Sequence, residues 1–190
     1  MNYIAESSIS RIFQHIEEGT RSFGVVSAFR KRNSDVENTK LHGELKAAVR
    51  GLGLGFIEMR GGYKGDEGFN IELSLFIPSI TRKQIIELGE KYDQDTIIFK
   101  DTKEFSLIGS NNSSGVGSLV ASFKYGSGKD NIVLAQDAMK DFFSSLLKGN
   151  DKGKKFLFKM EEQQEWGFLT RAYAPKTVSP KWFVVYEETE

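Results

Sequence analysis

The stretch SFGVVSAFRKRNSDVENTKL, residues 22–41, combines a strand, a cluster of cations and the start of a helix. Residues 22–29 are nearly all apolar, which is typical of an interior β-strand. Ser34 and Glu37 form an S-x-x-E capping box, and the apolar positions that follow predict a helix over 35–50 with one buried face. The sequence LGFIEMR predicts a second strand at 54–60. Together these segments have the spacing of a β-α-β unit, whose crossover is right-handed if the strands are parallel neighbours.

The rest of the chain alternates predicted strands and helices. Further helices are predicted over 8–18, over 81–92 from the capping box of Thr81 and Gln84, and over 135–149. Further strands are predicted at 69–77, 96–100, 105–109, 119–125, 156–160, 166–173 and 181–188. The sequence GGYKGDEG is expected to form a turn-rich loop, and residues 110–118 are expected to form the most flexible loop.

This order of elements predicts an α+β fold. We expect a mixed β-sheet with three to four helices, an N-terminal β-α-β unit and a strand-rich C-terminal half. No long linker or repeat divides the chain, so we expect a single domain over residues 1–190. The alternative is a division into an α/β core at 1–109 and a strand-rich extension at 110–190.

The composition excludes several classes of protein. The chain has 190 residues, 39% of them hydrophobic, and Lys plus Arg equals Asp plus Glu at 26 each, so the net charge predicts neither nucleic-acid nor membrane binding. Cysteine is absent, which excludes disulfides, thiolate zinc sites and cysteine nucleophiles. No signal peptide and no membrane-spanning segment is expected from the apolar pattern. We therefore expect a cytoplasmic protein.

The two strand ends of the β-α-β unit predict a binding edge. If the strands run in parallel, Arg30–Asn33 and Arg60–Tyr63 leave the sheet at one edge, where ligands of open α/β sheets bind. Residues 21–64 hold nine Lys or Arg against four Asp or Glu, which favours an anion such as a nucleotide, a phosphate or RNA. The start of the helix near Asp35 adds backbone N–H groups and a positive dipole end. The predicted ligand-binding residues here are Arg30, Arg32, Asn33, Arg60, Gly61, Gly62 and Tyr63. The alternative is that the cations are solvated and the glycines form a turn.

Other chemical motifs are weak. GLGLGF at 51–56 follows a helix and enters a strand, which is the reverse of a dinucleotide fingerprint, and YGSGKDN at 125–131 lacks the spacing of a phosphate loop. His15 and His42 lie beside apolar stripes, so neither a catalytic triad nor a histidine metal site is expected. Neither a cofactor nor a metal is expected. Glu72 is an alternative catalytic base or metal ligand, although an ion pair with Arg60 across the strands is the simpler interpretation.

The middle of the chain resembles a small family of uncharacterised phage and bacterial proteins. The matching features, in order, are FGVVSAFR with Asn33 and Asn38, GFIEMRGGY, the acidic residue in ELSLFIP, ITRKQIIELGEKY and QDTIIFKD, over about residues 22–101. The resemblance implies that the functional positions are Ser27, Arg30, Asn33, Asn38, Arg60, Gly62, Tyr63, Glu72, Gln94 and Asp95. It also implies a glycine where this chain has Asp93, and Asp adopts the left-handed conformation of that position only at some cost.

These observations favour a phage-type accessory protein without enzymatic activity. It would bind a host protein, a nucleotide or a nucleic acid through the basic edge, in the host cytoplasm, to counter host defence or take over host machinery. One alternative is an enzyme acting on a phosphate-containing substrate, with Glu72 as base or metal ligand and Arg60 stabilising charge. A further alternative is a virion or assembly component.

Overall fold

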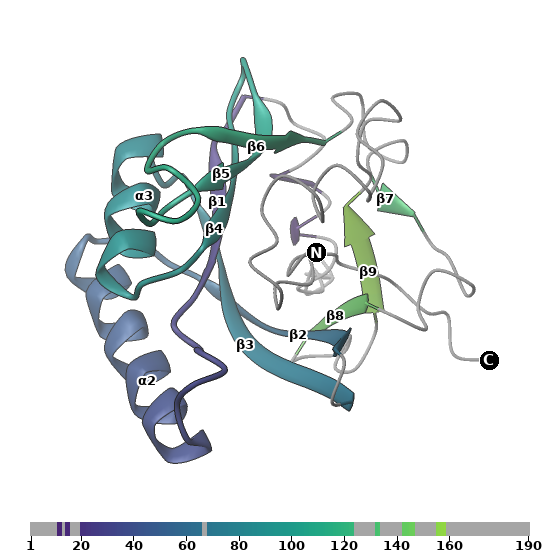
Figure 1. Ribbon diagram of the computed structural model, residues 1–190. Coiled ribbons are helices and arrows are strands. Elements are labelled where there is room, and N and C mark those ends of the chain that lie inside the picture. Colours follow the sequence, from purple (N-terminus) through teal and green to yellow (C-terminus); the bar gives the residue numbers. More distant parts are fainter. Residues whose placement is uncertain are drawn as a thin grey trace, which may run out of the picture.

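A computed structural model of the chain describes residues 11, 12, 14, 15, 20–65, 68–123, 132, 133, 142–146 and 155–158. It is a curled β-sheet with two helices packed side by side on one face (Figure 1). The helices are α2 (Asp35–Gly51) and α3 (Arg82–Lys91). The strands are β1 (Phe23–Ser27), β2 (Ile57–Gly65), β3 (Gly68–Pro78), β4 (Thr96–Lys100), β5 (Phe105–Gly109), β6 (Leu119–Ser122), β7 (Ile132–Val133), β8 (Phe142–Leu146) and β9 (Lys155–Phe158).

The order of strands corrects the predicted β-α-β unit. The sheet runs β6-β5-β4-β1-β3-β2-β8-β9-β7, and its ladders among the described residues are all antiparallel, so the expected mixed sheet is wrong. β3 lies between β1 and β2 and pairs with both. The reason is the glycine-rich segment, which extends β2 to Gly65 and pairs it with Gly68 at the start of β3, so that β2 and β3 form a hairpin. Because β1 and β2 are each antiparallel to β3, they still run in the same direction.

The α+β class is confirmed, but the expected three to four helices are not matched. Within the described part of the chain, α2 and α3 are complete helices, and residues 11, 12, 14 and 15 are also helical. Residues 142–146 form β8 instead of part of a helix, because FFSSL suits a strand and the open edge of β2 supplies its partner. The predicted strands at 166–173 and 181–188 lie outside the described residues. The single-domain arrangement stays a prediction.

Local sequence signals define both helices as predicted. Ser34 accepts a hydrogen bond from the backbone of Glu37, whose side chain accepts from the backbone of Ser34, and Thr81 and Gln84 form the same reciprocal cap. Each cap satisfies N–H groups that a helix start leaves unpaired. No helix within the described ranges is long and apolar enough to cross a membrane.

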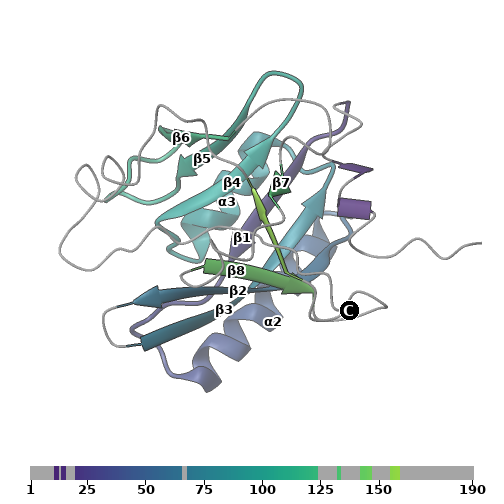
Figure 2. The same ribbon diagram turned by 90° about the vertical axis from the view of Figure 1, so that its right-hand side faces the viewer.

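The two faces of the sheet have different neighbours. Leu75 and Ile77 of β3 pack with Leu45 of α2 and Ile85 of α3, so odd-numbered residues of β3 face the helices. The even-numbered Phe76 faces the other side, where it stacks on Phe23 with ring centroids 4.7 Å apart. β8, β9 and β7 curl over this second face (Figures 1 and 2). A residue of β3 therefore belongs either to the helix-packed face or to the enclosed face, according to its number.

Candidate functional site

The backbone after β1 is held by a helix side chain. Asn38 of α2 accepts a hydrogen bond from the N–H of Arg30 at 2.8 Å and donates one to its carbonyl oxygen at 3.1 Å. Asn38 is buried, and its amide also lies 3.4 Å from that of Asn33. The resemblance implies a functional role for Asn38, and the contacts show a structural one, namely shaping the turn between β1 and α2.

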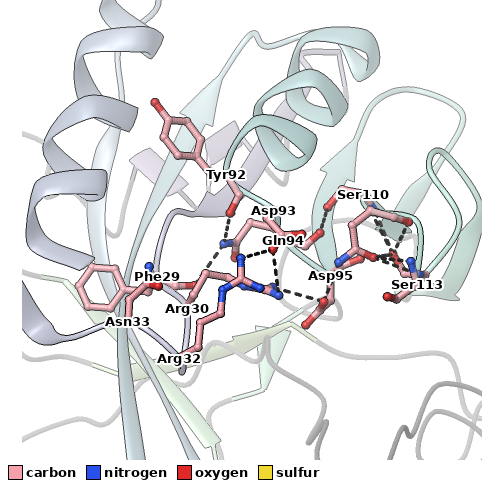
Figure 3. Close-up of polar contacts among 12 residues, drawn as sticks. Phe29, Arg30, Arg32, Asn33, Tyr92, Asp93, Gln94, Asp95, Ser110 and Ser113 are labelled. Carbon is pink, nitrogen blue, oxygen red and sulfur yellow. Dashed lines mark hydrogen bonds and ion pairs between the residues drawn. The ribbon is translucent and has the colours of Figure 1, made fainter. Parts of the chain in front are cut away.

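The side chains of this corner form a network of ion pairs. Arg30 lies 3.3 Å from both Asp93 and Asp95, one through each terminal nitrogen, and Arg32 also contacts Asp93 (Figure 3). Asp93 has a φ of 52°, so it occupies the left-handed position where a glycine is expected. We attribute its tolerance there to the two arginines that its carboxylate contacts. Carboxylates of the same molecule therefore already occupy the guanidinium that was predicted to clamp an anion.

The loop after β5 is tightly bonded to the same corner. Ser110 donates to the carbonyl of Gln94 at 2.7 Å (Figure 3). Asn111 donates to the Asp95 carboxylate at 2.7 Å, and Ser114 donates to the carbonyl of Asp95. These contacts link the loop at 110–118 to the start of β4. Beside it lies an open polar hollow of about 220 Å³, lined by Glu90, Asp93, Ser110, Asn111, Asn112, Ser113 and Val116.

Gln94 joins the ends of β1 and α3. Its buried side-chain amide donates to the carbonyls of Phe29 at 3.2 Å and Tyr92 at 3.1 Å. Ser27 is also buried, and its hydroxyl donates to the carbonyl of Leu73 and accepts from the N–H of Phe29, both at 2.9 Å. These two positions, which the resemblance implies to be functional, therefore hold the backbone of the corner in place.

The second half of the predicted binding edge lies apart from the first. Arg60 is opposite Leu73 in the β2–β3 ladder, and β3 separates it from β1. Two strand spacings amount to about 10 Å, and the Arg30 side chain turns away from β2 toward the start of β4. Gly61, Gly62 and Tyr63 continue β2 instead of forming a turn. The structure does not bring Arg30 and Arg60 together; ligand binding by either group of residues stays a prediction.

Glu72 lies on the enclosed face of the sheet. It is only 5% exposed, and its partner in the ladder is Gly61, not Arg60. Because adjacent residues of a strand face opposite sides, Arg60 projects from the helix-packed face while Glu72 projects from the other. This register excludes the expected ion pair between them. Glu72 is thus a buried carboxylate on the enclosed face, apart from the basic corner.

We expect Asn38→Ala to destabilise the protein by about 2 kcal/mol. The change leaves the backbone N–H of Arg30 without its partner in a partly buried position, and it removes a second hydrogen bond to the carbonyl. Chemical denaturation of both proteins would measure the difference. The matched control is Asn33→Ala, which loses only the 3.4 Å contact and should change stability by less than about 0.5 kcal/mol. Equal effects of the two substitutions would contradict a structural role specific to Asn38.

The stability of the fold should depend on the titration of His42. This side chain is 4% exposed, and neither ring nitrogen has a hydrogen-bond partner in the part of the chain that the structure describes. Its ring lies edge-on to that of Phe29, with the centroids 6.1 Å apart. Burial lowers the pKa of His42, and the neighbouring Lys46 lowers it further, whereas Glu58 raises it. The unfolded chain, with a pKa of about 6.5, then binds a proton more readily than the folded one, so stability is lost as pH falls below about 6.5.

Titration of one such group changes the free energy of unfolding by at most about 1.4 kcal/mol per pH unit. We expect the difference in unfolding free energy between wild type and His42→Phe to change between pH 7 and pH 5, with the wild type losing more. A difference that is constant over this range would contradict the prediction. Any fixed effect of the larger ring cancels in this comparison.

Comparison with protein-family models identifies the chain. Residues 24–141 match the model of the S-adenosylmethionine lyase family, which is more than half of the sequence. The chain belongs to that family. A search of curated proteins gave no match. The matched region begins in β1, contains the corner and Glu72, and includes most of the segment on which the family resemblance was based.

Membership of a lyase family corrects the functional expectation. The family is one of enzymes, so a non-enzymatic accessory protein of host–virus interaction is contradicted, and the enzyme alternative agrees better. The resemblance over residues 22–101 correctly indicated a domain family, but the name of the matched family states an activity. The phage origin, the expected partners and the cytoplasmic location stay predictions.

Two features of the structure were not predicted from the sequence: the burial of Ser74 and the ion pairs of Asp93. The sequence predicted no role for Ser74, yet it is fully buried near Glu72 on the enclosed face. The available signal was the polar alternation Asn70, Glu72, Ser74 within an apolar strand, which is unusual for a face that ends up buried. Asp93 was noted for its conformation, but its pairing with Arg30 and Arg32 was not foreseen.

Proposed function

We propose that this protein is an S-adenosylmethionine lyase and that Glu72 is the carboxylate that acts on its substrate. The family match supports the reaction. The burial of Glu72 on the enclosed face supports the residue, because a carboxylate held away from water interacts strongly with a cationic substrate. The proposal agrees with the expected alternative of an enzyme with Glu72 as base. It does not retain the expected phosphate-containing substrate, because S-adenosylmethionine carries no phosphate.

The substrate is chemically matched to a buried carboxylate. Its sulfur is a sulfonium, which bears a positive charge and leaves as a neutral thioether when a carbon–sulfur bond breaks. A carboxylate in a site of low dielectric interacts with such a cation far more strongly than it would in water. Glu72 would therefore hold the sulfonium end of the substrate and orient the bond that breaks.

Two reactions satisfy the definition of a lyase for this substrate. In both, the bond that breaks joins sulfur to the γ-carbon of the amino-acid arm. In an elimination, Glu72 takes a proton from the neighbouring β-carbon, a carbon–carbon double bond forms, and the electrons of the carbon–sulfur bond leave with the thioether. In an internal displacement, the carboxylate of the substrate attacks the same γ-carbon, a lactone forms, and the same thioether leaves. Glu72 is a base in the first reaction and an electrostatic orienting group in the second.

Arg60 and the basic corner are not part of this proposal. Arg60 projects from the opposite face of the sheet, and the Arg30 guanidinium contacts Asp93 and Asp95. Gly61 does belong to it, because it lies directly across from Glu72 in the ladder. Of the ligand-binding residues that the sequence predicts, Gly61 therefore has the best placement for the lyase reaction.

The test is an assay of the purified full-length chain with S-adenosylmethionine and no other reactant. We expect methylthioadenosine to accumulate, and mass spectrometry of the other fragment to distinguish an unsaturated amino acid from a lactone. Unchanged substrate after prolonged incubation with folded protein would refute the proposed activity.

A further inference from the structure

Ser74 has a buried hydroxyl that no described part of the chain satisfies. The residue is 0% exposed, and its Oγ has no hydrogen-bond partner among the described residues. Buried polar side-chain atoms in folded proteins nearly always have such a partner, and each exception calls for an explanation. Ser74 is two residues from Glu72 on β3, so both side chains project from the same face of the sheet.

The neighbours of Ser74 across the sheet explain why its hydroxyl stays without a partner. Ser27 lies opposite it on β1, but that hydroxyl donates to the carbonyl of Leu73 and accepts from the N–H of Phe29. Met59 lies opposite it on β2, and a thioether is only a weak acceptor. The Ser74 hydroxyl therefore faces the enclosed side, and the described residues leave its donor and acceptor positions unused.

Gly61 places a residue without a side chain beside the same pair. It is buried and stands directly across from Glu72, and a side chain at this position would project from the enclosed face next to the carboxylate. Glycine in the interior of a strand costs stability and often marks a close approach by a ligand. Glu72, Ser74 and Gly61 thus combine a carboxylate, a free hydroxyl and an absent side chain on one patch.

We propose that the Ser74 hydroxyl is a substrate-binding group that hydrogen-bonds S-adenosylmethionine in the same subsite as Glu72. This inference rests on the proposed lyase function and adds to it a specific contact. The hydroxyl gains a hydrogen bond when the substrate binds. The cost of burying it without a partner therefore raises the free energy of the substrate-free protein relative to that of the complex. It takes no part in bond breaking.

The test compares Ser74→Ala with a matched control, Ser106→Ala. Ser106 is also a buried strand serine, but its ladder partner Phe99 packs with the helix-side core, so Ser106 belongs to the other face. We expect Ser74→Ala to raise KM for S-adenosylmethionine about 5- to 10-fold with kcat little changed, which is the pattern of a ground-state contact. Its melting temperature without substrate should be unchanged or higher, because an unsatisfied hydroxyl has been removed. Ser106→Ala should leave KM within about twofold of wild type.

The outcomes separate this inference from the proposed function. If wild type cleaves the substrate and Glu72→Gln is impaired, but Ser74→Ala has the KM of Ser106→Ala, the inference alone is overturned. A fall in the melting temperature of Ser74→Ala by several degrees would show a structural role and would also overturn it. If wild type neither binds nor cleaves S-adenosylmethionine, both proposals fail. Recovery of the wild-type KM in Ser74→Thr, which restores the hydroxyl, would support the contact.

Discussion

Glu72→Gln should lower the rate of S-adenosylmethionine cleavage by about 10²- to 10⁴-fold, the range typical of losing a general base or a charge that stabilises the transition state. The substitution keeps the size and shape of the side chain and removes its charge and basicity. Because Glu72 is buried, water does not replace the lost carboxylate. Initial rates measured with saturating substrate, together with a circular dichroism spectrum to verify the fold, would test the expectation.

The control for this variant is Glu58→Gln. Glu58 is a carboxylate of the neighbouring strand β2, but it projects from the helix-packed face, where it accepts a hydrogen bond from Lys46 of α2 at 2.8 Å. We expect its activity to stay within about threefold of wild type, since loss of a partly exposed pair costs little. If Glu72→Gln and Glu58→Gln retain the same activity, Glu72 is not the acting carboxylate.

Gly109→Ala should destabilise the fold by about 3 kcal/mol or more, which is the upper part of the range for overpacking. A Cβ atom at this position would come within 3.0 Å of the backbone carbonyl oxygens of Ser114 and Gly115. Backbone atoms cannot move aside as a flexible side chain can, so the loop that carries Asn111 must shift. Urea denaturation would measure the loss, and the Asn111–Asp95 contact should weaken with it.

Gly43→Ala provides the opposite control. Gly43 lies within α2, and a Cβ atom added there meets nothing within 4 Å. Alanine is a better helix former than glycine, so this variant should gain about 0.5–1 kcal/mol. An unchanged free energy of unfolding in Gly109→Ala would contradict the close packing of Ser114 and Gly115 against Gly109.

The predicted elements that depended on local signals agree with the structure. The strands at Thr96–Lys100 and Phe105–Gly109 have the predicted limits, and the capping boxes at Ser34 and Thr81 begin their helices as expected. The left-handed conformation at Asp93 was instead implied by the family resemblance. These features arise within a few residues, where propensity and capping determine the conformation.

The predictions that required partners between strands failed. The neighbours of β1 are β3 and β4, not β2, and residues 142–146 became a strand because the edge of β2 was open to them. The apolar pattern of residues 135–149 predicted a helix, because it contains no information about the free edge of β2. Pairing between distant segments depends on which strand edges and faces remain free after the others have packed, and no short window of sequence contains that information.

By itself, the sequence determined an α+β chain without cysteine chemistry, the starts of two helices, and a set of polar residues worth locating. Only the tertiary structure decided how those residues are grouped. The β2–β3 register set Glu72 against Gly61 and sent Arg60 to the opposite face, and the start of β4 brought Asp95 to Arg30. The physical reason is the alternation of side chains along a strand: a shift of one residue in register moves a side chain from one face of the sheet to the other.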